Sequence, residues 1–116
     1  MAKSKCTTAL RWILAAFFAF GAVGNVFASE TILADYQRWG YPWGFNYVTG
    51  LVELASSALL ITRFRLQGAL LGSAVMAAAA GTVVLHGELL HSIAPLVVLS
   101  LSSLLAVAVM KTTAQD

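Results

Sequence analysis

Four long apolar stretches dominate the sequence of 116 residues. They cover about residues 9–27, 45–61, 66–85 and 93–110. Each stretch is close to the roughly 20 residues that an α-helix needs to cross the hydrocarbon core of a bilayer. An α-helix also satisfies its own backbone hydrogen bonds, which lipid cannot do. The sequence therefore predicts an all-α, polytopic membrane protein built as a bundle of four transmembrane helices.

The composition supports a membrane location. Hydrophobic residues make up 59% of the chain and charged residues only 10%, whereas an average soluble domain has roughly 25% charged residues. This balance argues against a soluble enzyme, a nucleic-acid-binding protein and a disordered chain. The single cysteine, Cys6, rules out an intrachain disulfide and a cysteine-based metal site. We expect one domain over residues 1–116, with the lipid bilayer as its first partner.

The basic residues predict the orientation of the helices. Six of them fall on one side of the predicted membrane, namely Lys3, Lys5, Arg11, Arg63, Arg65 and Lys111. Arg38 lies on the other side with three acidic residues, Glu30, Asp35 and Glu88. Basic residues concentrate on the cytoplasmic side of membrane proteins. We therefore predict a multi-pass protein of the cell membrane with both termini in the cytoplasm.

A cleaved signal peptide is an alternative for the first stretch. Its basic start and the small residue at the end of Val26-Phe27-Ala28, before Ser29, resemble a secretory signal. The apolar run is longer than the usual hydrophobic region of such a signal. We therefore expect this stretch to stay in the protein as a helix.

The first outer link predicts a short helix at the membrane interface. Ser29 is suited to cap its start, and Gly40 is suited to end it in a left-handed conformation. Ile32, Tyr36 and Trp39 would then share one face. Aromatic residues typical of an interfacial belt follow closely; the set is Tyr36, Trp39, Tyr41, Trp43 and Tyr47. A helix lying on the membrane surface is favoured over a lid above a substrate site.

Glu53 is the residue least expected within a transmembrane helix. Ionisable residues inside the bilayer cost about 2.5–3.5 kcal/mol on insertion scales, and they usually mark function. Asn46, Gly50, Glu53 and Ser57 follow helical spacing and form one polar stripe. Such a stripe is expected to face the interior of the bundle rather than lipid.

Other polar residues fall at a similar predicted depth. Asn25 lies near the end of the first stretch, His86 follows the third, and His91 precedes the fourth. With Asn46 and Glu53, they predict a polar pocket near the outer leaflet, roofed by the aromatic link. The alternative is that Glu53 only joins helices through hydrogen bonds. The segment from His86 to His91 offers no third strong ligand, so we predict no metal site.

Several short motifs resemble the DoxX-like family of small four-helix membrane proteins, which is related to DoxX and DoxD. They are Gly40-Tyr41-Pro42, Gly50-Leu51-Val52-Glu53-Leu54, Arg63 with Arg65, His86 and Pro95. The family is similar in fold to the DoxD subunit of thiosulfate:quinone oxidoreductase. By this resemblance, Glu53 occupies the acidic position of a Gly-x-x-Glu-Leu motif and His86 the position of the family histidine. Asn25 and His91 match no family motif. Some relatives take part in membrane redox complexes, and others help to assemble membrane proteins.

The pocket leads to a functional hypothesis. We expect it to bind a lipophilic small molecule such as a quinone or an isoprenoid-like compound. If the pocket is catalytic, Glu53 and His86 would perform acid–base chemistry, as in an isomerisation or an epoxide opening, or quinone-linked redox chemistry. The expected substrate-binding residues are Asn25, Asn46, Trp43, Tyr47 and His91. The sequence identifies no cofactor.

A non-catalytic role is the alternative. The chain would then be a subunit or assembly factor of a larger membrane complex, with its helix faces bound to a partner membrane protein. Gly68 and Gly72, four residues apart, would also suit close helix packing. Packing within one bundle is favoured there, and a contact in a homo-oligomer is the other interpretation.

Overall fold

The computed structural model describes the backbone of residues 2–115 and the side chains of residues 5–112. This part of the chain is all-α, without strands, as predicted. The elements are α1 (Ala2–Val26), α2 (Glu30–Arg38), α3 (Phe45–Leu60), α4 (Arg65–Leu85), the 3₁₀-helix η1 (Leu89–Ser92) and α5 (Ile93–Gln115). The predicted domain also includes Met1 and Asp116, which lie outside the described residues.

Three segments are long and apolar enough to cross a membrane. Within the described residues they are Lys5–Val26, Arg65–Leu85 and Leu89–Thr112. The protein is therefore a membrane protein with several apolar helices. The fourth predicted span corresponds to α3, which has 16 residues and a length of about 24 Å, against a hydrocarbon core of about 30 Å. A fourth crossing by α3 stays a prediction.

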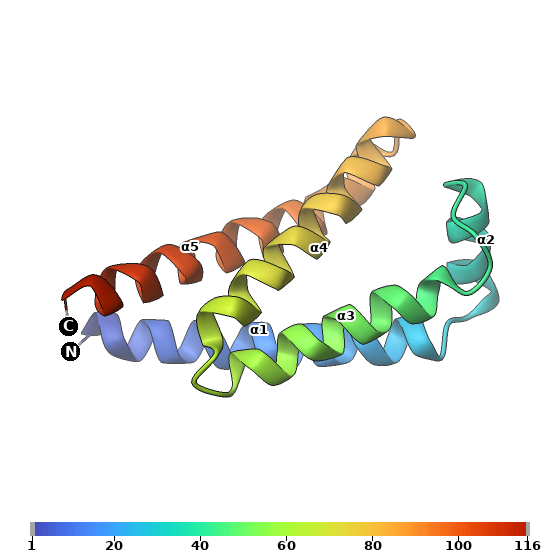
Figure 1. Cartoon of the computed structure of the whole chain (residues 1–116). Helices are drawn as coiled ribbons and strands as arrows, with labels where there is room; N and C mark the ends of the chain where they lie inside the picture. The colour runs from blue at the N-terminus through green and yellow to red at the C-terminus, as the bar shows by residue number, and fades with distance from the viewer. Residues whose placement is uncertain (1, 116) are drawn as a thin grey trace.

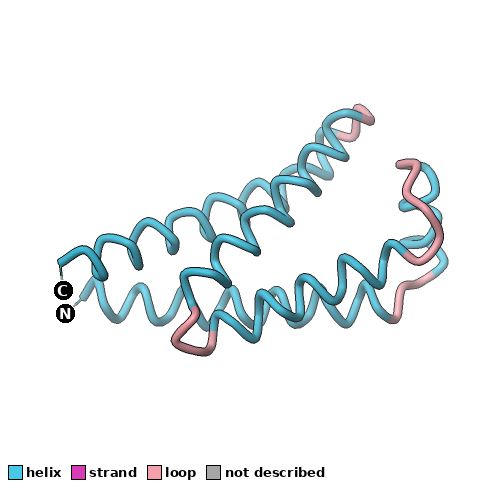
Figure 2. The backbone as a smooth tube through the Cα atoms, in the orientation of Figure 1, coloured by secondary structure: helices cyan, strands magenta, loops and turns pink. Residues whose placement is uncertain are grey.

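The long helices form two pairs that diverge. Helix α1 packs chiefly against α3, and α4 packs chiefly against α5. Figure 1 shows both chain termini at one end of the molecule, where the two pairs meet, and α2 at the other end, where they separate. We call these the terminal half and the α2 half. The backbone trace in Figure 2 shows the two connections of α2 at the end away from the termini, and the α3–α4 connection in the half toward the termini.

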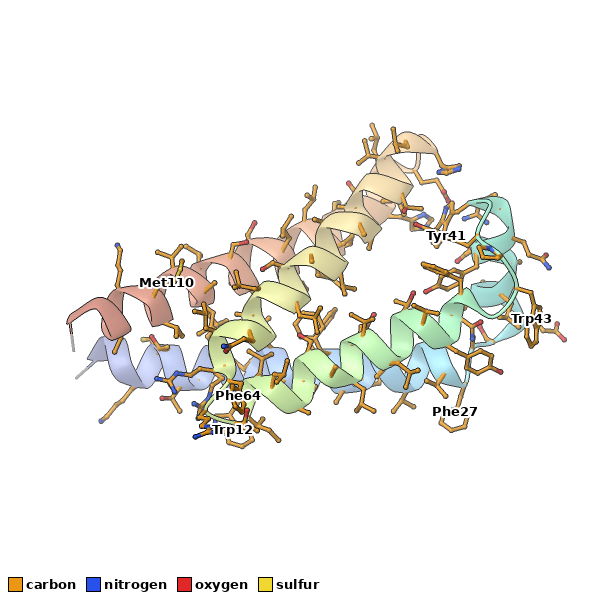
Figure 3. All side chains as sticks on the ribbon, viewed as in Figure 1. Trp12, Phe27, Tyr41, Trp43, Phe64 and Met110 are labelled. Atoms are coloured by element: carbon orange, nitrogen blue, oxygen red, sulfur yellow. The ribbon has the colours of Figure 1, made fainter. Side chains whose placement is uncertain are left out.

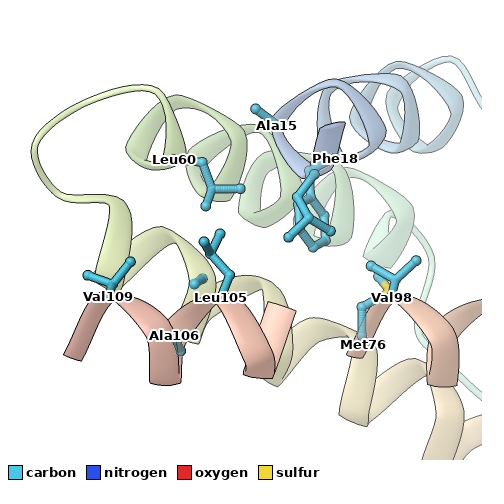
Figure 4. Packing of buried hydrophobic residues seen from close by; sticks show 10 residues of the cluster. Ala15, Phe18, Leu60, Met76, Val98, Leu105, Ala106 and Val109 are labelled. Atoms are coloured by element: carbon cyan, nitrogen blue, oxygen red, sulfur yellow. The ribbon is translucent and has the colours of Figure 1, made fainter. Parts of the chain in front are cut away.

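The terminal half holds a tightly packed apolar core. Phe18, Leu60 and Leu105 are completely excluded from solvent, and they come from α1, α3 and α5. Figure 4 shows Phe18, Leu60, Leu105 and Val98 directed into the space between these helices. The cluster joins the two helix pairs at this end.

Small residues allow the helices of the terminal half to approach closely. A Cβ atom added at Gly72 would lie 2.5 Å from the ring of Phe18 and 2.9 Å from Ser56 Oγ. The same serine hydroxyl donates a hydrogen bond to the carbonyl of Gly68 (2.8 Å), and Ser57 donates to the carbonyl of Ala15 (2.7 Å). These contacts are of the kind that small and hydroxylated residues provide between membrane helices.

The short helix predicted in the first outer link is present as α2. Ser29 caps it by accepting a hydrogen bond from the backbone N–H of Ile32, and Gly40 adopts a left-handed conformation with φ of 84°. None of its residues is buried. Its position at a membrane interface stays a prediction.

Candidate functional site

A cavity lies between the two helix pairs in the α2 half. Its volume is about 500 Å³, and every α-helix and η1 contribute to its wall. The wall is largely apolar toward the terminal half, where Phe17, Val75 and Met76 lie. A volume in this range, with apolar walls and few polar groups, is typical of sites for small molecules.

Glu53 lies on α3 in the wall of this cavity, and only 5% of the residue is exposed. Its Oε1 accepts a hydrogen bond from the side-chain amide of Asn25 (3.2 Å). Its Oε2 has no hydrogen-bond partner among the described residues. A methyl group at Gly21 would overlap this oxygen, so the glycine is what admits the carboxyl group against α1.

Asn25 connects three helices through hydrogen bonds. Its Nδ2 donates to the carbonyl of Gly21 (3.0 Å) as well as to Glu53, and its Oδ1 accepts from the Tyr36 hydroxyl (2.6 Å). Its backbone carbonyl accepts from the side-chain amide of Asn46 (2.7 Å). Burial raises the pKa of Tyr36 above its usual value of 10.0, which keeps the phenol protonated as a donor. The network therefore holds α2 to the site of the buried carboxyl group.

Four aromatic side chains form one side of the cavity, from α2, the following loop and the start of α3. They are Tyr36, Trp39, Tyr41 and Phe45. The rings of Tyr41 and Phe45 are stacked with centroids 4.5 Å apart, and Tyr36 makes edge contacts with Trp39 and Tyr41. Figure 3 shows Tyr41 between the α2 segment and α4. We call these four residues the aromatic wall.

Polar contacts hold the α2 segment to the far helix pair. Arg38 forms an ion pair with Glu88 (2.6 Å), and the indole N–H of Trp39 donates to the other oxygen of that carboxylate. The Trp39 hydrogen bond and the Arg38 guanidinium lower the pKa of Glu88 below its usual value of 4.5. The hydroxyls of Tyr41 and Thr82 share a hydrogen bond. We call the Arg38, Trp39 and Glu88 contacts the Glu88 latch.

The structure brings some of the predicted site residues together. Asn25, Glu53 and His91 line the cavity. Asn46 is buried behind it and supports Asn25, while Trp43 is 93% exposed and lies on the outer side of the α2 segment (Figure 3). Tyr47 is about half exposed and is not in the wall of the cavity.

His86 is not in the wall of the cavity that Glu53 lines. It follows the end of α4, it is exposed, and its Nδ1 lies 2.8 Å from the carbonyl of Thr82. Thr82, one turn earlier, faces the cavity instead. The described residues contain no group of three or more His, Cys, Asp or Glu side chains that could hold a metal ion.

The sequence interpretation missed several residues of the cavity wall. Thr49 and Phe45 were not expected there, and Tyr41 was assigned only to the interfacial belt. For Tyr36 and Trp39 a signal was present, because their spacing places them on one face of α2 with Ile32. All three line the cavity.

Comparison with known proteins supplies the family. A family model described as the DoxX-like family matches residues 9–109. No curated protein and no solved structure matches the chain significantly. The match covers α3 and α4 completely, most of α1 and α5, and every residue that lines the cavity. The chain therefore belongs to the DoxX-like family.

Proposed function

We propose that this protein binds a lipophilic small molecule in the cavity between its two helix pairs. The observation that carries the proposal is the cavity of about 500 Å³ with an apolar inner wall and one buried carboxyl group, whose Oε2 has no hydrogen-bond partner among the described residues. Empty apolar space costs contacts that a bound molecule would restore. A buried polar atom without a partner is also unusual and requires an explanation.

The geometry favours binding over an acid–base reaction by Glu53 and His86. Glu53 is in the wall of the cavity, but His86 is not, and its Nδ1 lies beside a backbone carbonyl. General acid–base partners must lie within hydrogen-bond reach of the same reacting group. Glu53 and Asn25, with His91 in the same cavity wall, would hold a polar group of the ligand.

A variant that fills the cavity and a matched control outside it test this proposal. Ala79 lines the cavity, whereas Ala77 on the same helix is exposed and lies outside it. The probe is 1-decanol, measured by equilibrium dialysis against lipid nanodiscs with and without the protein. We expect the wild type and Ala77→Phe to bind decanol above the background of empty nanodiscs, and Ala79→Phe to lose at least about 10-fold in affinity. Equal binding by both variants would contradict the proposal, as would no binding above background by the wild type.

We further propose that both termini are cytoplasmic and that the cavity lies on the opposite side of the membrane. The charge distribution supports this orientation, and both termini lie at the end opposite α2 (Figure 1). Cys6 is exposed and serves as a natural reporter near the N-terminus. An impermeant thiol reagent applied outside intact cells should label Glu30→Cys in a Cys6→Ser background, and it should not label Cys6. Labelling of both positions from the same side would contradict this topology.

A further inference from the structure

The charges around the cavity are unbalanced. Glu53 and Asp35 are in its wall, and no lysine or arginine is among the described residues that line it. The guanidinium of Arg38 is paired with Asp35 (2.8 Å) and with Glu88 (2.6 Å). His91 does line the cavity, and its Nδ1 lies 3.5 Å from the same Glu88 carboxylate. An anionic ligand would therefore find no free counter-charge, and an anion buried without one is strongly disfavoured.

The aromatic wall favours a cationic ligand. The faces of aromatic rings carry partial negative charge and attract cations, most strongly where water is excluded. Tyr36, Tyr41 and Phe45 contact one another and line the same side of the cavity. The hydroxyl of Tyr36 and the carboxyl group of Glu53 bind the same amide of Asn25. The rings and the carboxyl group are therefore neighbours in one site.

We propose that the cavity selects lipophilic ammonium compounds, that is, alkyl or aryl amines and quaternary ammonium ions. The cationic head lies against the aromatic wall with Glu53 as its counter-charge, and the apolar part extends along Met76 and Val83 toward the terminal half. This inference rests on the proposed function, because it names the ligand class for the same cavity. Fatty acids and lipid phosphates are excluded by the same charge argument.

Three probes with one alkyl chain and different heads test the ligand class: decyltrimethylammonium, 1-decanol and decanoate. Each is dialysed against protein in nanodiscs of zwitterionic lipid, and empty nanodiscs give the background partitioning. We expect decyltrimethylammonium to bind at least about 10-fold more tightly than 1-decanol, because a desolvated cation–π contact corresponds to about 30-fold in affinity. Decanoate should bind most weakly.

Matched variants test which residues cause the preference for the ammonium compound. Glu53→Gln should reduce the affinity for decyltrimethylammonium about 10-fold and leave that for 1-decanol within about twofold. Glu30→Gln removes the same charge from an exposed residue in the same half, outside the cavity, and should change neither. Tyr41→Leu should weaken the binding of decyltrimethylammonium more than that of 1-decanol. It provides a second test if Glu53→Gln does not fold.

The outcomes separate the two proposals. If no probe binds above the background, the proposed function fails and this inference falls with it. If 1-decanol binds but decyltrimethylammonium binds no more tightly, or decanoate binds equally well, the proposed function stands and the ligand class is wrong. A cation preference that survives in both Glu53→Gln and Tyr41→Leu would also overturn the assignment.

Discussion

The two halves of this molecule are built from the same four long helices but packed in different ways. In the terminal half, Phe18, Leu60 and Leu105 fill the space between helix pairs, and Gly72 leaves room on α4 for the ring of Phe18. In the α2 half, the pairs diverge around a cavity: Asn25 holds α2 to α1 and α3, and Arg38 and Trp39 hold the α2 segment to Glu88, which follows α4. The contrast indicates that stability is concentrated at one end, which leaves the other end free to hold a ligand.

The largest expected effect comes from adding a methyl group in the terminal half. Gly72→Ala should lower the free energy of unfolding by about 1–3 kcal/mol, because the new Cβ would overlap the ring of Phe18, which is completely buried and cannot move away. Gly81→Ala is the control on the same helix. Nothing lies within 4 Å of its Cβ position, so it should be neutral or stabilise by up to about 1 kcal/mol. Unfolding in mixed detergent micelles measures both, and equal stabilities would contradict the contrast between halves.

A smaller effect is expected where α1 meets the buried carboxyl group. Gly21→Ala should cost about 1 kcal/mol, because the methyl group displaces a flexible side chain, that of Glu53, rather than a fixed ring. In a Glu53→Ala background the same change should cost almost nothing, so the two substitutions should be coupled. Gly24→Ala has no atom within 4 Å of its Cβ and serves as the control. Additive effects would show that Gly21 does not make room for the carboxyl group.

The smallest effect concerns the Glu88 latch and its dependence on pH. The pKa of Glu88 is lowered in the folded protein. The latch therefore contributes its full stabilisation of the fold at pH values above the usual carboxyl pKa of 4.5. Its contribution is lost as the pH falls through the lowered value. The indole N–H resonance of Trp39 should therefore titrate with a midpoint below 4.5, while that of exposed Trp43 should stay unchanged. A midpoint at or above 4.5, or an unchanged titration of Trp39 in Glu88→Gln, would contradict the latch.

Much of this architecture could be predicted from the sequence. Apolar length located the four long helices to within several residues, and cap chemistry at Ser29 and Gly40 located α2. The polar stripe on α3 correctly indicated that Asn46 and Glu53 turn inward, since both are buried. These features depend on local spacing, which a single sequence records directly.

The divergence of the helix pairs could not be predicted in this way. It depends on how small residues such as Gly68 and Gly72 meet partners on other helices, which no periodicity specifies. The placement of His86 had the same difficulty. His86 directly follows the last residue of α4 and is exposed, whereas Thr82, one turn earlier, faces the cavity. The aromatic wall likewise forms only when α2 folds back over the start of α3.

Photolabelling shows directly whether a lipophilic molecule binds in the cavity between the two helix pairs. A 1-decanol analogue with a diazirine at the end of its chain or beside its hydroxyl can be photolysed on the protein in nanodiscs, and the labelled residues identified by mass spectrometry. We expect labelling beside Glu53 with one probe and near Met76 with the other, and loss of both labels with excess unlabelled 1-decanol. Labelling confined to exposed positions such as Phe20 and Leu70, without competition, would contradict a ligand site between the helix pairs.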